Sequence, residues 1–228
     1  MTSSESDSKN LFDKNLPRCN WCNLKNPKYI DYHDNEWGSF SEKSTDDKYL
    51  FEMLTLESFQ AGLSWECVLN KREDFRSAYD GFDLEKVCGY GEEKIAELLA
   101  NPKIIRNRLK IKSSISNARI FRTICLEYGS FFSFIKKFLD EYLCNDSVAE
   151  KKNTKIEIIE ENSKNKSDFS GIKIIHETGK ATNGLSDSIS AELKKRGMKF
   201  MGSTIVYSFL QAIGVIFSHG EECFLFRD

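Results

Sequence analysis

Two cysteine–histidine pairs at opposite ends of the chain have the donor types of a metal site. Cys19 and His33 lie near the start, and His219 and Cys223 stand four residues apart after the last apolar segment. Two thiolates and two imidazoles form a tetrahedral donor set that suits Zn²⁺. Spacing alone leaves another interpretation open, in which the cysteines are small apolar side chains and the histidines lie on the surface. If zinc binds, it joins the two ends of the chain.

Cys19 also forms a C-x-x-C pair with Cys22, a spacing that occurs in both metal-binding and redox-active sites. The seven cysteines are odd in number and scattered, which fits a reducing compartment better than a disulfide framework. We therefore expect a cytoplasmic protein. His176 is the third histidine, and because it stands within a polar segment we expect it to take no part in the metal site.

Glu57 is the charged residue whose position is most informative. It lies on one helical stripe with apolar residues, namely Leu50, Met53, Leu54 and Ala61. A regular helix would therefore turn the Glu57 carboxylate toward the core or a cleft wall, where an unpaired charge is costly. Two interpretations remain open: a structural glutamate paired with a lysine or arginine, or a carboxylate held for a cationic or hydrogen-donating ligand.

Aromatic residues flank the helix that would carry Glu57. They are Trp21, Tyr29, Tyr32 and Trp37 before the helix and Trp65 after it. Most buried aromatic side chains simply belong to a core. Several of them around a carboxylate would also form a pocket for a flat cationic heterocycle, because such a ligand is held by stacking and cation–π attraction.

Basic residues are concentrated in two stretches. Between residues 101 and 122 there are seven and no acidic residue: Lys103, Arg106, Arg108, Lys110, Lys112, Arg119 and Arg122. A second cluster consists of Lys194, Lys195, Arg196 and Lys199. A solvated helix face is the ordinary explanation of such runs. The first run lies at a predicted helix–turn–helix junction, where backbone amides near Leu109 would add to a phosphate site.

Composition excludes several classes of protein. With 228 residues, 40% of them hydrophobic and 30% charged, the chain has neither the composition of a disordered protein nor a strong net charge, which is −2. The longest apolar stretch is interrupted by polar residues and is too short to span a membrane, and the N-terminus has no secretory signal. A role with nucleic acid must therefore rest on local basic patches.

The periodicity predicts an all-α fold. Helical patterns cover Ser44–Ala61, Arg72–Tyr79, Asp83–Gly89, Glu92–Ala100, Leu109–Tyr128, Phe131–Tyr142, Asp187–Arg196 and Thr204–Phe217. Ser44 and Asp47 have the spacing of a capping box, and Gly62 would end the first helix. We expect a flexible leader over residues 1–16 and a single domain of two helical lobes over residues 17–228. A polar insertion at about 144–182 contains two short β-like patches, Lys155–Ile159 and Gly171–Ile175.

Three long motifs resemble the bacterial DNA-3-methyladenine glycosylase I family. They are the runs Tyr29–Gly38, Phe51–Trp65 and Leu193–Gly214. The likeness covers most of residues 18–223 and omits the leader and much of the insertion. It implies a helix-hairpin-helix glycosylase fold. Cys22 and the insertion lie outside the family pattern, and Leu109 stands where a glycine is common in the family hairpin.

The resemblance also assigns roles to individual residues. It implies one structural Zn²⁺ on Cys19, His33, His219 and Cys223. It places base recognition, as the catalytic role, on Glu57 and the pocket aromatics Tyr29, Tyr32, Trp37 and Trp65. It maps the loop that probes the lesion gap to Gly62, Leu63 and Ser64, and the DNA-binding hairpin to residues 104–110. With the basic run, the predicted DNA contacts are Gly62, Leu63, Ser64, Lys103, Arg106, Arg108 and Lys110.

The function that the resemblance implies is excision of 3-methyladenine from double-stranded alkylated DNA. Such an enzyme hydrolyses the N-glycosyl bond and leaves an abasic site and free 3-methyladenine, with no strand cleavage. We expect it to act as a monomer on the chromosomal DNA in the bacterial cytoplasm, with no membrane partner. Two alternatives are a non-catalytic, zinc-stabilised module that senses alkylated or abasic DNA, and a glycosylase that prefers another base such as 3-methylguanine.

Overall fold

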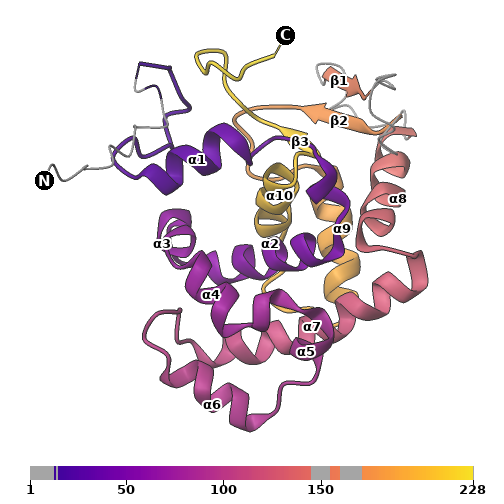
Figure 1. Ribbon diagram of the computed structural model, residues 1–228. Coiled ribbons are helices and arrows are strands. Elements are labelled where there is room, and N and C mark those ends of the chain that lie inside the picture. Colours follow the sequence, from indigo (N-terminus) through magenta and orange to yellow (C-terminus); the bar gives the residue numbers. More distant parts are fainter. Residues whose placement is uncertain (1–12, 14, 145–154, 160–170, 228) are drawn as a thin grey trace, which may run out of the picture.

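Helices make up most of the computed structural model, which describes residue 13 and residues 15–144, 155–159 and 171–227 (Figure 1). The helices are α1 (Pro27–Asn35), α2 (Asp47–Gln60), α3 (Trp65–Asn70), α4 (Arg72–Ala78), α5 (Leu84–Cys88), α6 (Glu92–Ala100), α7 (Arg108–Tyr128), α8 (Phe131–Cys144), α9 (Gly184–Lys195) and α10 (Ser203–Ala212). The predicted leader, apart from residues 13, 15 and 16, and much of the predicted insertion lie outside the described residues. Neither α1 nor α3 was predicted from periodicity.

α2 lies at the centre of the fold. Every residue from Tyr49 to Phe59 is buried, and α3, α7, α8 and α10 all contact this helix (Figure 1). Glu57 is therefore buried, as predicted, but its neighbours on the other faces of α2 are buried as well. The burial of Glu57 follows from the central position of α2. The helix is buried on all its faces here, and the single inward stripe that the spacing predicted is not what distinguishes Glu57.

The start of α2 differs from the prediction. Asp46 caps the helix, and its side chain accepts a hydrogen bond from the Lys48 amide. Ser44 instead belongs to a short 3-10 helix, Glu42–Thr45, where it forms a capping box with Ser41. The predicted capping box of Ser44 with Asp47 is therefore wrong. Ser44 and Asp46 are both residue types that cap helices, and from sequence alone either one could begin α2.

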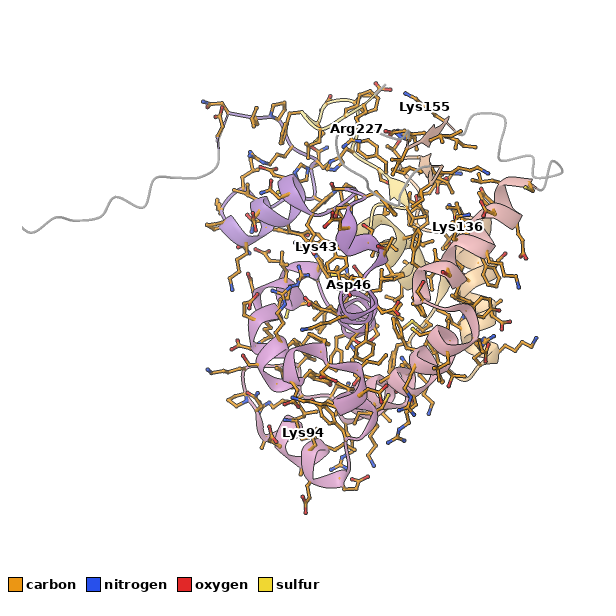
Figure 2. All side chains as sticks on the ribbon, turned by 45° about the vertical axis from the view of Figure 1, so that its right-hand side comes forward. Lys43, Asp46, Lys94, Lys136, Lys155 and Arg227 are labelled. Atoms are coloured by element: carbon orange, nitrogen blue, oxygen red, sulfur yellow. The ribbon has the colours of Figure 1, made fainter. Side chains whose placement is uncertain are left out.

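α6 and α7 are joined by a hairpin, residues 101–107, at the end of the molecule that carries Lys94, opposite Lys155 and Arg227 (Figure 2). Ile104 fixes the hairpin from inside, because its side chain is buried in the hydrophobic core. Asn107 caps α7, and its side-chain oxygen accepts hydrogen bonds from the amides of Leu109 and Lys110. The helix pair thus has the arrangement that the sequence predicted.

The fold is mostly helical, as predicted, and the described residues also form one small three-stranded sheet. Its order is β1 (Lys155–Ile158), β2 (Lys173–His176) and β3 (Ile216–Phe217), with β1 antiparallel and β3 parallel to β2. The first two strands correspond to the β-like patches of the insertion. The third lies where the sequence predicted the end of a helix.

Gly214 explains why the last helix ends early. Its φ is +76°, and a Cβ at this position would overlap the backbone of Ser39 and Phe40. A glycine is therefore required here, and the chain leaves α10 in a direction that a helix cannot follow. β3 then carries the chain to His219, beside the residue 37–40 segment. Among the described residues, no helix has both the length and the apolar character needed to cross a membrane.

Candidate functional site

The four predicted metal ligands come together at one point. The ligand atoms of Cys19, His33, His219 and Cys223 all lie within 4.8 Å of one another. The His219 Nδ1 atom is 3.5 Å from Cys19 Sγ and 3.4 Å from Cys223 Sγ, and the His33 Nε2 atom is 3.5 Å from Cys223 Sγ. Ligand atoms about 3.5 Å apart are what a tetrahedral zinc with bonds of about 2.0–2.3 Å requires.

The second nitrogen of each imidazole is held by an oxygen atom. His33 Nδ1 lies 2.8 Å from Asp34 Oδ1, and His219 Nε2 lies 3.1 Å from the Trp37 carbonyl oxygen. In each ring the other nitrogen faces the cysteine sulfurs. This is the support that metal-binding histidines usually have, because it fixes the ring orientation and the tautomer.

Burial affects the two kinds of ligand differently: it keeps the imidazoles neutral, as metal binding requires, and it disfavours a free thiolate. It lowers the pKa of His219 to about 4 and also lowers the pKa of His33, so both imidazoles are neutral near pH 7. It raises the pKa of the Cys19 thiol to about 11. A thiolate at that position therefore needs a cation, and the donor set fits a metal ion such as Zn²⁺.

The other predicted cysteine and histidine lie apart from this group. The Cys22 thiol is buried and points to the Tyr29 carbonyl oxygen at 3.8 Å. His176 lies in β2, where its Nε2 atom is 2.8 Å from Glu157 Oε2. The cluster that holds the four ligand atoms includes neither residue.

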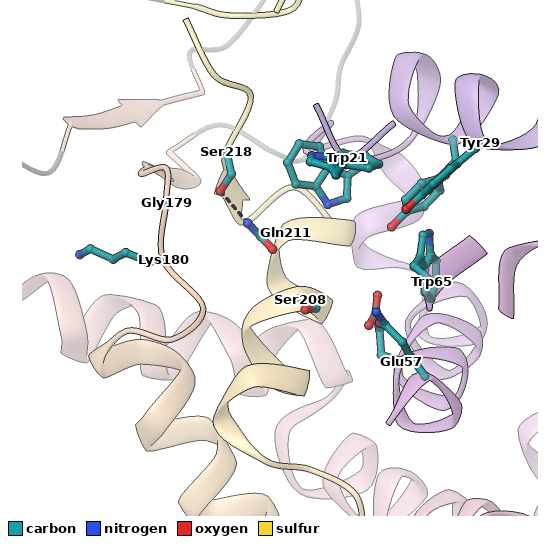
Figure 3. A pocket seen from close by; sticks show the side chains of 12 residues that line it. Trp21, Tyr29, Glu57, Trp65, Gly179, Lys180, Ser208, Gln211 and Ser218 are labelled. Atoms are coloured by element: carbon teal, nitrogen blue, oxygen red, sulfur yellow. Dashed lines mark hydrogen bonds between the residues drawn. The ribbon is translucent and has the colours of Figure 1, made fainter. Parts of the chain in front are cut away.

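A pocket of about 350 Å³ lies next to this group of four candidate metal ligands, and it brings together the predicted recognition residues (Figure 3). Its lining includes Glu57 and the four predicted aromatics, Tyr29, Tyr32, Trp37 and Trp65. Figure 3 shows the Glu57 side chain beside Trp65, with Tyr29 above both. The pocket and the cluster share a wall, because the Trp37 and His219 rings pack edge to face with centroids 4.7 Å apart.

Glu57 has an unusual environment for a carboxyl group. Its exposed fraction is 2%, and its Oε2 atom has no hydrogen-bond partner among the described residues. Burial raises the pKa of Glu57 to about 8. The buried arginine Arg72 is committed to other carboxylates, because it pairs with Glu36 at 2.7 Å and also with Glu52. The structural pairing of Glu57 with a basic residue is therefore absent from the described part of the chain.

Trp65 offers a second open polar atom in the pocket. Its Nε1 atom is buried and has no hydrogen-bond partner among the described residues. The Trp65 ring lies against the Tyr32 ring, with centroids 5.2 Å apart and planes at 45°. On the neighbouring wall, the rings of Trp21 and Trp37 meet edge to face at 4.7 Å. Aromatic faces and edges, together with the unpaired Glu57 Oε2 and Trp65 Nε1 atoms, therefore border the cavity.

The rest of the lining comes from residues that the sequence analysis did not select as site residues. They are Gln60, on the same helix as Glu57, and Gly179, Lys180, Ser208, Gln211 and Ser218. Trp21, one of the aromatics that precede this helix, also lines the pocket. Gln211 donates from Nε2 to Ser218 Oγ at 2.8 Å, the bond drawn in Figure 3. Ser208 and Gln211 lie three residues apart on α10. Two polar residues at that spacing in an otherwise apolar helix were the available signal, because they share one helix face.

The predicted DNA-contact residues lie in two surface segments. Gly62, with φ +79°, turns the chain after α2, Leu63 is exposed, and Ser64 caps α3 by accepting a hydrogen bond from the Cys67 amide. Lys103, Arg106 and Arg108 are exposed on the hairpin and the first turn of α7. The hairpin touches α3, because Lys71 Nζ donates to the Lys103 carbonyl oxygen at 2.9 Å.

Lys110 does not lie on this surface. Its exposed fraction is 7%, and Nζ donates to the carbonyl oxygens of Phe59 and Ala61 at 2.8 and 2.6 Å. The prediction that Lys110 contacts DNA phosphate therefore does not fit its position. The cause is the end of α2, which offers carbonyl groups to the ammonium in place of solvent.

The two basic stretches are less open than their sequences indicate. Carboxylates from other helices pair with Lys112, Arg122 and Arg196: Glu92 at 2.8 Å, Glu85 at 2.9 Å and Glu127 at 2.7 Å, respectively. The amides of Leu109 and Lys110 are taken by Asn107, so they add little to a phosphate site. Arg106 and Arg108 are exposed and have no ion pair with a described residue. Lys103 is also exposed, and its Nζ atom lies 4.0 Å from Asp74 Oδ1. The hairpin and the first turn of α7 therefore present three basic groups, of which the two arginines are unpaired among the described residues.

Comparison with known proteins gives a consistent result. The model of the methyladenine glycosylase family matches residues 21–227. DNA-3-methyladenine glycosylase 1 of Escherichia coli (strain K12) is 38% identical over 208 residues, which cover 91% of this chain and 96% of that protein. A crystal structure of 3-methyladenine DNA glycosylase I matches with a TM-score of 0.71 at 38% identity, over 92% of this chain and 100% of that chain.

A further structural neighbour is 3-methyladenine DNA glycosylase I from Staphylococcus aureus, in a structure that gives the basis of its 3-methyladenine recognition. It matches with a TM-score of 0.69 at 28% identity, over 87% of this chain and 91% of that chain. The resemblance of the sequence motifs is thereby confirmed. The chain belongs to the methyladenine glycosylase family.

Proposed function

We propose that this protein excises 3-methyladenine from alkylated double-stranded DNA by hydrolysis of the N-glycosyl bond. The observation that carries the proposal is the buried, unpartnered Glu57 carboxyl group in an aromatic pocket. The relatives named as DNA-3-methyladenine glycosylases support the same reaction. A purine is buried inside a duplex, so the target nucleotide must be flipped out of the stack to reach this pocket.

The chemistry of the lesion reduces what the enzyme has to supply. Methylation at N3 places a positive charge on adenine, which weakens the glycosidic bond and makes the base a better leaving group. The task of the pocket is therefore selection. Burial favours the protonated form of Glu57 in the free protein, and the positive charge of the flipped base favours loss of that proton. The resulting carboxylate accepts hydrogen bonds from the base and offsets its charge, and the aromatic rings pack against the faces of the base. Neutral adenine lacks the charge and is held less well.

Water completes the reaction, and we expect no strand cleavage. As the charged base leaves, water adds to the oxocarbenium-like sugar carbon, so the products are free 3-methyladenine and an abasic site. A lyase step would need an amine nucleophile at the sugar. Lys180 lines the pocket, but its side chain points away from Glu57 in Figure 3 and pairs with Glu177 at 3.0 Å.

The exposed loop and hairpin supply the DNA contacts in this proposal. Leu63, between Gly62 and Ser64, is the apolar side chain placed to enter the gap that the flipped nucleotide leaves. Lys103, Arg106 and Arg108 hold the phosphate backbone beside it, and this contact is electrostatic and independent of sequence. We expect the protein to bind DNA as a monomer and to act in the cytoplasm.

We further propose that Cys19, His33, His219 and Cys223 hold one Zn²⁺ in a structural role. The donor set and the second-sphere oxygens of Asp34 and Trp37 support this choice. All four tetrahedral positions are filled by protein atoms, so the ion supplies a link between the chain ends and no reaction step. The Phe224 amide also donates to the Pro17 carbonyl oxygen at 2.8 Å, which shows how closely these ends pack.

Base release from methylated DNA tests the proposal. Duplex DNA treated with a methylating agent is incubated with the protein, and the free purines are separated by chromatography. Release of 3-methyladenine supports the proposed activity. Release of 3-methylguanine in preference identifies a glycosylase of another specificity, and DNA binding without any base release identifies the non-catalytic sensor.

A further inference from the structure

Lys110 is a buried charged residue for which the excision mechanism gives no role. It lies in the first turn of α7, directly after the hairpin, yet its ammonium points inward to the end of α2. There it donates to two carbonyl oxygens, those of Phe59 and Ala61. α2 has no basic residue in its own last turn, so Lys110 serves as its cationic C-terminal cap from another helix.

The two bonded carbonyls lie between Glu57 and the exposed loop. Phe59 is two residues after Glu57, and Ala61 immediately precedes Gly62. The loop itself is short and turns sharply, with the Leu63 amide donating to the Gln60 carbonyl oxygen at 2.6 Å. Any shift of these carbonyls therefore moves the side chain of Leu63 relative to the pocket.

A second lysine makes a similar bond on the far side of the loop. Lys71, the C-cap of the helix that carries Trp65, donates to the Lys103 carbonyl oxygen in the hairpin. Both helices that flank the loop are thus tied to this region: Lys71 joins the end of α3 to the hairpin, and Lys110 joins the end of α2 to the first turn of α7, which follows the hairpin directly. Of the two, Lys110 is buried and makes two bonds.

We propose that Lys110 is a positioning residue that holds the loop 62–64 and the end of α2 in register with the DNA-binding hairpin. DNA held by Arg106 and Arg108 is thereby placed at a fixed distance from Leu63 and from the pocket that contains Glu57. The effect of Lys110 on excision is exerted through the loop, without contact to phosphate or base. This inference rests on the proposed excision activity.

The test compares Lys110→Met with the wild type and with Lys136→Met. Lys136 is an exposed lysine of α8 that pairs with Asp140 one turn later, far from the hairpin (Figure 2). We expect Lys110→Met to lower the single-turnover excision rate about tenfold or more, because a small misplacement of reacting groups is costly. Its duplex affinity, the salt dependence of that affinity and its free 3-methyladenine binding should match the wild type. Lys136→Met should match the wild type throughout.

A phosphate contact would give the opposite pattern. It predicts a weaker duplex affinity and a salt slope smaller by about one for Lys110→Met, and that result overturns the proposal. A wild-type excision rate in Lys110→Met also overturns it. Lys110→Arg keeps a charged donor for the carbonyls and should recover most of the lost rate, whereas failure to recover any contradicts the positioning role.

Two further measurements keep the test decisive. If Lys110→Met does not fold, Lys110→Gln, which retains an N–H donor, is used for the same comparison of rate with salt slope. Hydrogen exchange of the Leu63 amide is measured in parallel on duplex-bound protein, and it should be about tenfold faster or more in the variant. Unchanged exchange overturns the proposal. If the Leu63 amide exchanges faster in the variant but the wild-type protein releases no base, the proposed function is wrong and the positioning role of Lys110 still holds.

Discussion

Glu57 and Trp65 each place a buried polar atom in the same pocket, and neither atom has a hydrogen-bond partner among the described residues. Glu57 Oε2 is an acceptor and Trp65 Nε1 is a donor. A purine carries both donors and acceptors on its edges, so one flipped base can satisfy both atoms together. The cost of leaving these atoms unpaired in the free protein is then recovered only when a base of matching pattern is bound.

The pH dependence of stability should report the burial of Glu57. Burial raises its pKa from the usual 4.5 to about 8, so between these values the folded state keeps a proton that the unfolded chain has lost. Stability from this group is therefore full below pH 4.5 and falls as the pH rises to about 8, by about 1.4 kcal/mol per pH unit.

Urea unfolding at several pH values checks this expectation. Glu57→Gln cannot titrate at this position. The difference in free energy of unfolding between Glu57→Gln and the wild type should therefore shift in favour of the variant as the pH rises from 5 to 8. Parallel pH profiles for the two proteins would show that Glu57 is not the buried acid described here.

The metal cluster should contain one zinc per chain. Elemental analysis of protein purified in reducing buffer measures the stoichiometry directly. Cys223→Ser removes one thiolate and should lower the melting temperature by about 5 °C or more, because metal binding is coupled to folding. Cys144→Ser, which changes an exposed cysteine outside the cluster, is the matched control. Absence of zinc, or equal melting temperatures for both variants, would contradict the structural role.

Asp34 should tune the metal site through His33. Its Oδ1 atom is 2.8 Å from His33 Nδ1, and loss of such a partner typically lowers metal affinity by roughly 10–100-fold. Asp34→Asn should show this loss in competition with a chelator. Asp31→Asn removes a carboxylate from the same helix that accepts a hydrogen bond from the exposed Asn35 amide, and it should retain wild-type affinity. Equal affinities for the two variants would separate Asp34 from the metal site.

Arg106 should contribute to DNA binding and to its salt dependence. Its guanidinium is exposed and has no ion pair with a described residue, so Arg106→Ala should weaken duplex binding and reduce the salt slope by about one. Arg122 belongs to the same basic run but pairs with Glu85 at 2.9 Å. Arg122→Ala should therefore leave the slope unchanged. If the two substitutions have equal effects, the hairpin is not the DNA contact.

The site could be predicted from sequence where side-chain type alone decides the chemistry. Two cysteines and two histidines suit one metal wherever the fold brings them together, and the structure places all four within 4.8 Å. Glu57 stood out because a carboxylate among apolar residues needs a reason. Helices such as α7 and α8 follow from local periodicity, which depends only on residues nearby in the chain.

Features that depend on distant partners could not be predicted in this way. β3 is a strand because Ile216 pairs with Ile175, some forty residues earlier. Lys110 is buried because α2 happens to end beside it, and the same residue in a free helix would face solvent. Within the basic run, Lys112 and Arg122 form ion pairs with Glu92 and Glu85, which lie on other helices and could not be located from the sequence.

Single-turnover release of 3-methyladenine by Glu57→Gln, measured beside binding of the free base, tests the central claim most directly. The amide keeps the shape of the carboxylate and removes its charge. A charge-assisted hydrogen bond of this kind contributes roughly 1.5–3 kcal/mol, so binding and excision should each fall by roughly 10–100-fold while the fold stays intact. Glu57→Ala should lose more of both. Wild-type release and wild-type binding by Glu57→Gln would show that Glu57 is only a structural residue.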